Sequence, residues 1–244
     1  MLAKRITSLQ HPNIKHWIEL RKSRDYRVQA KSVLITGEKT IREFPFPLLC
    51  LVTQEPSDIT AQEKFIVPEE ILKKITALEE PDGFAAEVLL PPPQEIIDQN
   101  FVLILDQIQD PGNLGTLLRS ALAFGWEGII ATPGTVDLFN DKALRAAQGA
   151  TFRLPYCWKD PDQIAYWLEY KKRDLWVADL QGDSIESLTP RPPLALVLSS
   201  EGKGTSPWSK HLGRPIVIPM DNQVESLNVA SAGAILLYSL KRPL

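Results

Sequence analysis

The stretch that decides the fold is "FVLILDQIQDPGNLGTLLRSALAFG", residues 101–125. Its first six residues form a continuous run of β-favouring apolar side chains, which is typical of a strand buried on both faces of a sheet. A turn sequence follows, and then apolar residues recur at helical spacing. We expect this helix to begin at Asn113, whose side chain can cap it. A strand, a loop and a helix in succession form the repeating unit of a parallel α/β sheet.

The same unit recurs along the rest of the chain. Further apolar runs are "EGIIAT", "DLWVAD", "LALVLS" and "PIVIPM". Helices are predicted near residues 141–148 and 161–171, and a last helix follows Asn228. We therefore expect an α/β domain with a parallel sheet over residues 98–244. Ligands of such sheets bind at the carboxyl ends of the strands.

A proline-rich stretch, "LPPPQE" at residues 90–95, separates this domain from a smaller one, because three prolines cannot continue a helix or a strand ladder. We expect residues 1–93 to form a small α/β domain. It starts with a basic helix over residues 13–30, and "GEKTIREF" opens another helix. The predicted strands are "SVLIT", "LLCLVT", "KFIV" and "GFAAEVLL".

The composition is that of an ordinary globular protein, with 44% hydrophobic and 23% charged residues among 244. No apolar run approaches the roughly 20 residues that a membrane-spanning helix needs, and the start "MLAKRITSLQHP" lacks the apolar core of a secretory signal. We expect a cytoplasmic protein with no membrane partner. Cys50 and Cys157 lie far apart and the three histidines do not cluster with them, so we expect buried, reduced thiols and no metal site.

Charge is distributed unevenly. The net charge is −3, but residues 1–42 hold ten lysines and arginines against three acidic residues. Such an asymmetry favours a basic surface for a polyanion at one end of the chain. On charge alone, an ordinary solvated helix face is an equally good interpretation.

Two loops that follow strands carry conspicuous residues. The first contains Asn113, Gly115 and Arg119, at the start and within the predicted helix. The guanidinium of Arg119 either forms an ion pair at the surface or points to a phosphate or ribose. In the second, "LVLSSEGKG" at residues 196–204, two glycines let the backbone approach a ligand. The spacing is not that of a phosphate-binding Walker loop, and the chain has no dinucleotide-binding glycine fingerprint.

The third loop is "IPMDNQVESLNVASAGAILL", residues 218–237. Ser226 or Asn228 can cap the helix that follows. The small residues 230–234 let another segment approach the axis of this helix closely.

Taken together, the three segments resemble the three motifs of the SpoU family of S-adenosylmethionine-dependent RNA 2'-O-ribose methyltransferases. The matches are Asn113-Leu-Gly-x-x-x-Arg119, the stretch 196–204, and Ile218-Pro-Met220 with Ser226-Leu-Asn228. More weakly, "SVLITGEKTIREF" and "PDGFAAEVLL" resemble the ribosomal-protein-L30-like domain that binds RNA in members acting on ribosomal RNA. One departure is Ser199, where the family usually carries glycine.

The resemblance implies a SPOUT-type fold with a deep trefoil knot, a homodimer formed through the knotted domain, and methyl transfer without a metal. Arg119 would be the catalytic residue, either taking the proton of the 2'-hydroxyl or stabilising the developing alkoxide. The family's remaining motif residues would order the loops around it: Asn113, Glu201, Ser226 and Asn228. The cofactor S-adenosylmethionine would contact Leu198, Ser199, Gly202, Ile218, Met220 and Leu227.

Ribosomal RNA is the favoured substrate and transfer RNA the alternative. The alternative from a different class is a catalytically silent RNA-binding homologue that keeps the fold as a scaffold. Ser199 is the feature that favours this alternative. If Ser199 crowds the pocket, its replacement by glycine should tighten cofactor binding. An ordinary nucleotide-binding Rossmann domain is disfavoured by the missing glycine fingerprint.

Overall fold

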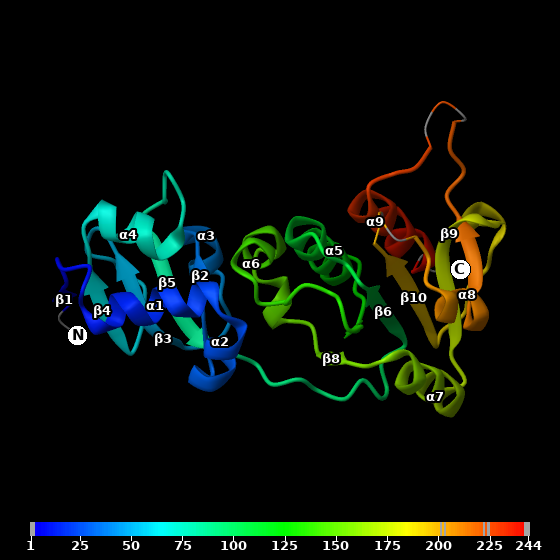
Figure 1. Cartoon of the computed structure of the whole chain (residues 1–244), viewed down its shortest axis with the longest axis horizontal. Coiled ribbons are helices and arrows are strands. Elements are labelled where there is room, and N and C mark those ends of the chain that lie inside the picture. Colours follow the sequence, from blue (N-terminus) through cyan, green and yellow to red (C-terminus); the bar gives the residue numbers. More distant parts are fainter. Residues whose placement is uncertain (1–2, 201, 203, 222, 224, 242–244) are drawn as a thin grey trace. The chain divides into compact units, whose positions relative to one another are not determined.

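The computed structural model describes residues 3–241 except 201, 203, 222 and 224. The chain divides into two compact units, which we call the N-terminal unit (Met1–Pro92 with Phe139–Gly149) and the C-terminal unit (Pro93–Leu138 with Ala150–Leu244). Figure 1 draws both units and labels their elements where there is room. Helix α6 (Asp141–Ala147) therefore groups with the N-terminal unit, where it contacts strand β2 (Ser32–Thr36).

The N-terminal unit contains a five-stranded mixed sheet in the order β1-β4-β3-β5-β2. Besides β2, its strands are β1 (Lys4–Arg5), β3 (Leu48–Thr53), β4 (Glu63–Ile66) and β5 (Phe84–Leu89). Its other helices are α1 (Pro12–Lys22), α2 (Arg24–Ala30), α3 (Glu38–Arg42) and α4 (Glu69–Thr76). Helices α1 and α4 bury apolar residues in one core, among them Trp17 and Ile71.

The prediction of one basic helix over residues 13–30 is wrong, because the helix is interrupted at Ser23. Helix α1 ends at Lys22 and helix α2 begins at Arg24. The Ser23 hydroxyl caps α2 by accepting the N–H of Tyr26 at 3.2 Å. Arg27, only 3% exposed, donates to the backbone oxygens of Leu20 at 2.6 Å and Arg21 at 3.2 Å. These bonds satisfy carbonyls that the end of α1 leaves without helical partners. Arg27 is therefore part of the packing and not of the basic surface.

Glu87 on β5 ties this unit together. Its carboxylate accepts hydrogen bonds from Trp17 Nε1 at 3.1 Å and Ser32 Oγ at 2.6 Å, and His16 Nε2 lies 3.0 Å away. Burial by itself raises the pKa of Glu87, but the hydrogen bonds from His16 and Ser32 hold it below its ordinary value. Helix α1 is thus fastened to β5 and β2 through one charged group.

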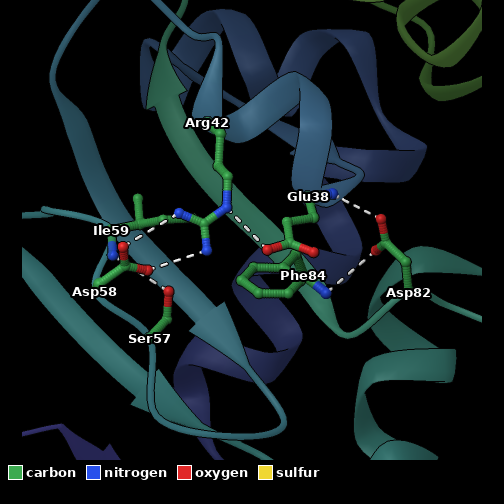
Figure 2. Close-up of polar contacts among 7 residues, drawn as sticks. All are labelled: Glu38, Arg42, Ser57, Asp58, Ile59, Asp82 and Phe84. Carbon is green, nitrogen blue, oxygen red and sulfur yellow. Dashed lines mark hydrogen bonds and ion pairs between the residues drawn. The ribbon is translucent and has the colours of Figure 1, made fainter.

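A second polar cluster, shown in Figure 2, fixes the short helix α3. Asp82 accepts the N–H groups of Glu38 at 2.6 Å and of Phe84 at 3.3 Å, so a residue of another loop caps the start of α3. Arg42 at its end donates to Glu38 at 2.8 Å and to Asp58 at 3.0 Å. The hydrogen bond from Arg42 lowers the pKa of Asp58. All of these side chains are solvent-accessible, so they order loops and add little to stability.

The C-terminal unit contains a six-stranded sheet in the order β11-β9-β10-β6-β7-β8, and every pair in it is parallel. The strands are β6 (Phe101–Asp106), β7 (Gly128–Ala131), β8 (Tyr156–Trp158), β9 (Asp174–Ser184), β10 (Leu194–Ser199) and β11 (Arg214–Val217). The helices are α5 (Pro111–Ala123), α7 (Pro161–Lys171), α8 (Pro207–Leu212) and α9 (Val229–Leu240), and two single 3-10 turns are Ala150–Phe152 and Ile185–Ser187. The predicted parallel α/β sheet is confirmed.

The start of α5 differs from the prediction. The helix begins at Pro111, and the side chain of Asp110 caps it by accepting the N–H of Asn113 at 2.7 Å. The prediction that Asn113 caps this helix is therefore wrong. An acidic residue followed by proline is the stronger start signal, because proline suits the first helical position, where no N–H partner is available.

Helices α5 and α9 pack against each other and α9 also contacts β10. Gly233 lies at this contact, where an added Cβ would come within 2.7 Å of Leu198 Cδ1 and would also collide with the side chain of Leu117. This close approach explains the small residues at the start of α9. The trefoil knot that the resemblance implies stays a prediction.

None of the described helices is long and apolar enough to cross a membrane. Within residues 3–241, leaving out the four positions named above, no group of three or more His, Cys, Asp or Glu is arranged to hold a metal ion. Both cysteines are buried free thiols, and burial raises the pKa of Cys50 to about 12 and that of Cys157 to about 11. Neither thiol is a thiolate at neutral pH.

Candidate active site

A pocket of about 390 Å³ lies beside the carboxyl ends of β10 and β11 and the middle of β9. This volume falls in the range of about 300–1,000 Å³ that is typical of small-molecule sites. Its described wall residues come from β9, from the ends of β10 and β11 and the segments that follow them, and from α8 and α9. They include Ala178–Gln181, Leu198–Ser200, Gly204, Thr205, Lys210, Ile216–Ile218, Met220, Ser226, Leu227, Val229, Ala232 and Leu236.

A bulge in β9 forms one side of this pocket. Val177 pairs with Pro215 of β11, and the next pair along is Asp183 with Ile216, so residues 178–182 of β9 have no partners there. Gly182 closes the bulge: a Cβ at this position would lie 2.5 Å from the backbone nitrogen of Ile216. Because backbone cannot move aside as a side chain can, the bulge needs glycine at its end.

Ser199, where the related motif has glycine, finds a partner on the neighbouring strand. Its Oγ donates to Asp106 Oδ2 at 3.3 Å. Asp106 is 2% exposed and also accepts from Thr132 Oγ1 at 2.9 Å, while its backbone oxygen accepts the N–H of Ser200 at 3.2 Å. The serine is thus accommodated by β6, and the pocket beside it remains open.

The first and third loops meet through two asparagines. Asn228 Nδ2 donates to Asn113 Oδ1 at 3.0 Å, which joins the starts of α5 and α9. Asn228 Oδ1 also accepts the N–H groups of Ala230 at 2.9 Å and Ser231 at 3.4 Å. Of the two expected caps for the last helix, Asn228 is confirmed as the cap.

The structure brings most of the predicted cofactor residues together. Those that line the pocket are Leu198, Ser199, Ile218, Met220 and Leu227, joined by Ser226 from the predicted catalytic group. Gly202 and Arg119 are not among the wall residues, and Arg119 is exposed on α5. Glu201 lies outside the described residues.

Sequence reasoning missed two acidic residues, Asp106 and Asp179. Each stands at the end of an apolar run, in "LILD" and "WVAD", and the two strands flank β10 in the sheet. An acidic residue directly after an apolar run was the available signal. It was overlooked because neither residue is one of the matched residues of the three motifs.

Comparisons with known proteins agree with this geometry. Residues 100–238 match the family model described as the SpoU rRNA Methylase family. The 23S rRNA (guanosine(2553)-2'-O)-methyltransferase RlmP of Bacillus subtilis is 32% identical over 248 residues, which cover 98% of this chain and 99% of that protein.

Solved structures share the fold along nearly the whole chain. The crystal structure of an RNA 2'-O ribose methyltransferase matches with a TM-score of 0.84 and 26% identity, over 97% of each chain. The SpoU methyltransferase AviRb from Streptomyces viridochromogenes, solved in complex with the cofactor AdoMet, matches with a TM-score of 0.83 over 95% of this chain and 97% of that one. Its identity is 24%, so this second likeness concerns the fold. The family model covers more than half of the chain and the likeness to RlmP spans nearly all of it, and the chain therefore belongs to the SpoU rRNA methylase family.

Proposed function

We propose that this protein transfers a methyl group from S-adenosylmethionine to a ribose 2'-hydroxyl of ribosomal RNA. The observation that carries the proposal is the convergence of two family motifs on one pocket of small-molecule size. The segments after β10 and β11 line it, and the first motif reaches its edge through the bond from Asn228 to Asn113. The relative RlmP supports the same reaction, since it is named for 2'-O-methylation of a guanosine in 23S rRNA.

The wall residues suit S-adenosylmethionine. Leu198, Ile216, Leu227 and Leu236 offer apolar surface for an adenine ring, and neutral polar groups stand among them, such as the hydroxyl of Ser226. Ser199 does not argue for a silent homologue, because its hydroxyl is bonded to Asp106. The cofactor supplies a methyl group already activated on a sulfonium, so the transfer itself asks the protein for positioning and charge stabilisation.

We assign the catalytic role to Arg119. A ribose hydroxyl becomes a good nucleophile only as its proton leaves, and negative charge develops on its oxygen. A guanidinium offers five N–H donors and no acceptor, so stabilising that charge suits it better than taking the proton. Asn113 and Asn228 hold the starts of α5 and α9 together. Glu201 and Ser226 would order the loops around the reacting groups, and Gly202 would offer its backbone to the cofactor.

The remaining assignments are also part of this proposal. Residues 1–93 would form an L30-like RNA-binding domain, and residues 98–244 the knotted catalytic domain. The protein would act in the cytoplasm as a homodimer formed through the catalytic domain. A guanosine of 23S rRNA is the first target to assay, and transfer RNA is the alternative substrate.

The decisive experiment is methyl transfer in vitro. The purified protein is incubated with tritiated S-adenosylmethionine and either 23S rRNA or transfer RNA from a strain lacking the gene, and 2'-O-methyl sites are mapped. We expect label in 23S rRNA at one ribose. Label only in transfer RNA would select the alternative substrate. If no RNA is labelled and calorimetry with S-adenosylhomocysteine gives no heat at millimolar ligand, the protein is a silent homologue.

A second prediction concerns the basic segment 1–42. Deleting it would remove core residues of α1 such as Trp17, so we expect charge substitutions to be the cleaner test. Lys15 and Lys22 are exposed on α1. Their replacement by glutamine should weaken RNA binding and reduce the slope of log affinity against log salt by about 0.7–0.9 for each phosphate that the protein no longer neutralises.

The measurement is a series of filter-binding titrations at several salt concentrations. Lys74→Gln is the matched control, since Lys74 is exposed on α4 outside the basic segment. Equal affinities and slopes for wild type, the double variant and the control would show that these lysines of α1 only form a solvated face.

A further inference from the structure

Two ionisable side chains stand out in the pocket wall. Among the described wall residues, Asp179 on β9 and Lys210 on α8 are the charged ones; the others are apolar or neutral. Lys210 Nζ lies 3.2 Å from Asp179 Oδ2. The Asp179 side chain is 12% exposed and the Lys210 side chain 57%, so the carboxylate is the inner member of the pair. In a pocket lined mainly by apolar side chains, a few placed polar groups of this kind fix the orientation of a ligand.

The Asp179 carboxylate is held in one orientation. Its Oδ1 accepts the N–H of Gln181 at 3.0 Å, within the same β9 bulge that Gly182 closes. Burial raises the pKa of Asp179, but the hydrogen bond from the Gln181 N–H and the nearby Lys210 ammonium outweigh burial and hold the pKa below its ordinary value. The group is therefore an ionised acceptor at neutral pH. Two carboxylate oxygens offer about four acceptor sites, so these partners leave capacity for a ligand.

We propose that Asp179 determines cofactor specificity by accepting hydrogen bonds from the ribose hydroxyls of the adenosine moiety of S-adenosylmethionine. This inference rests on the cofactor named in the proposed function. The vicinal diol presents two donors to one carboxylate, while the apolar wall residues Leu198 and Leu227 suit the adenine ring. Lys210 stays outside as the counter-charge that keeps Asp179 oriented before the cofactor arrives.

The test separates the diol from the other donor that a carboxylate could bind, the ammonium of the methionine moiety. Calorimetry is run with S-adenosylhomocysteine, with 5'-methylthioadenosine, which lacks the methionine moiety, and with the 2',3'-dideoxy form of 5'-methylthioadenosine. We expect Asp179→Asn to lower the affinity for S-adenosylhomocysteine and 5'-methylthioadenosine about tenfold, and Asp179→Ala to lower it about 100-fold. The reason is that hydrogen bonds to charged groups are stronger than those between neutral groups. The dideoxy ligand should bind wild type and both variants equally.

The matched control is Asp183→Asn, which removes the same charge from an exposed position of the same strand outside the pocket wall. It should bind all three ligands as wild type does. A thermal melt of each variant checks that it is folded.

Three outcomes would overturn the inference. If the Asp179 variants lose affinity for all three ligands equally, Asp179 has a purely structural role. If they lose affinity for S-adenosylhomocysteine alone, Asp179 binds the ammonium of the methionine moiety. Unchanged binding by a folded Asp179→Ala would remove it from the site, with the proposed function intact. By contrast, a wild-type protein that binds neither S-adenosylhomocysteine nor 5'-methylthioadenosine would overturn the proposed function together with this inference.

Discussion

Replacing Arg119 by alanine is expected to lower the rate of methyl transfer by about 10²–10³, which is the usual cost of losing one preorganised donor to a developing negative charge. Arg119 is exposed on α5 and is not part of the pocket wall. Its loss should therefore leave cofactor affinity and the melting temperature near their wild-type values. An interaction that forms only in the transition state lowers turnover without weakening ground-state binding.

Single-turnover assays with tritiated cofactor, beside calorimetry and a thermal melt, measure the three quantities separately. Arg119→Lys keeps the positive charge but loses the planar pair of donors, so it should also be slow. If Arg119 only makes a surface ion pair, the alanine variant will melt slightly earlier and will methylate RNA at nearly the wild-type rate. That result would contradict the catalytic assignment.

Replacing Gly182 by alanine should damage the pocket without touching any predicted catalytic residue. The added methyl group would meet the backbone of Pro215 and Ile216 at 2.5–2.6 Å, so β9 or β11 has to shift. Overpacking of this kind typically costs about 1–3 kcal/mol in the free energy of unfolding. We also expect affinity for S-adenosylhomocysteine to fall about tenfold or more, about 1.4 kcal/mol of binding free energy, because the bulge supplies the wall from Ala178 to Gln181.

Chemical denaturation and calorimetry check both effects. Asp183→Ala is the control, because this neighbouring residue is exposed and lies outside the wall. A Gly182→Ala protein with wild-type stability and cofactor affinity would mean that the two strands can separate at no cost, and that the bulge does not shape the pocket.

The strands of the C-terminal unit other than β8 were predictable because each contains a continuous apolar run, and a sheet covered on both faces demands such runs. The helix starts were harder. At α5 the competing candidates Asp110 and Asn113 are three residues apart and both are good caps, so only the position of Pro111 distinguishes them. Short elements such as β8 and α8 carry too few residues for a periodic pattern to show.

The pocket was predictable only as far as the motifs reach. Ser226, Leu227 and Met220 follow from the resemblance, and each lies in the wall. The bond from Ser199 to Asp106 joins residues 93 positions apart, and it exists because β10 pairs with β6. Asp179 enters the wall because β9 bulges between β10 and β11. Strand order and local register are products of the whole fold, and no pattern within a single segment encodes them.

The position of α9 after all the strands of the sheet also governs when the pocket comes into existence. Its wall draws on Ala178 at one extreme and on Leu236 at the other. A polypeptide whose helix α9 is still inside the ribosome can therefore have formed the sheet but not the complete wall of the pocket. The enzyme acquires its binding site only once α9 has emerged and packed, so no nascent chain that lacks this helix can hold the cofactor in a finished pocket.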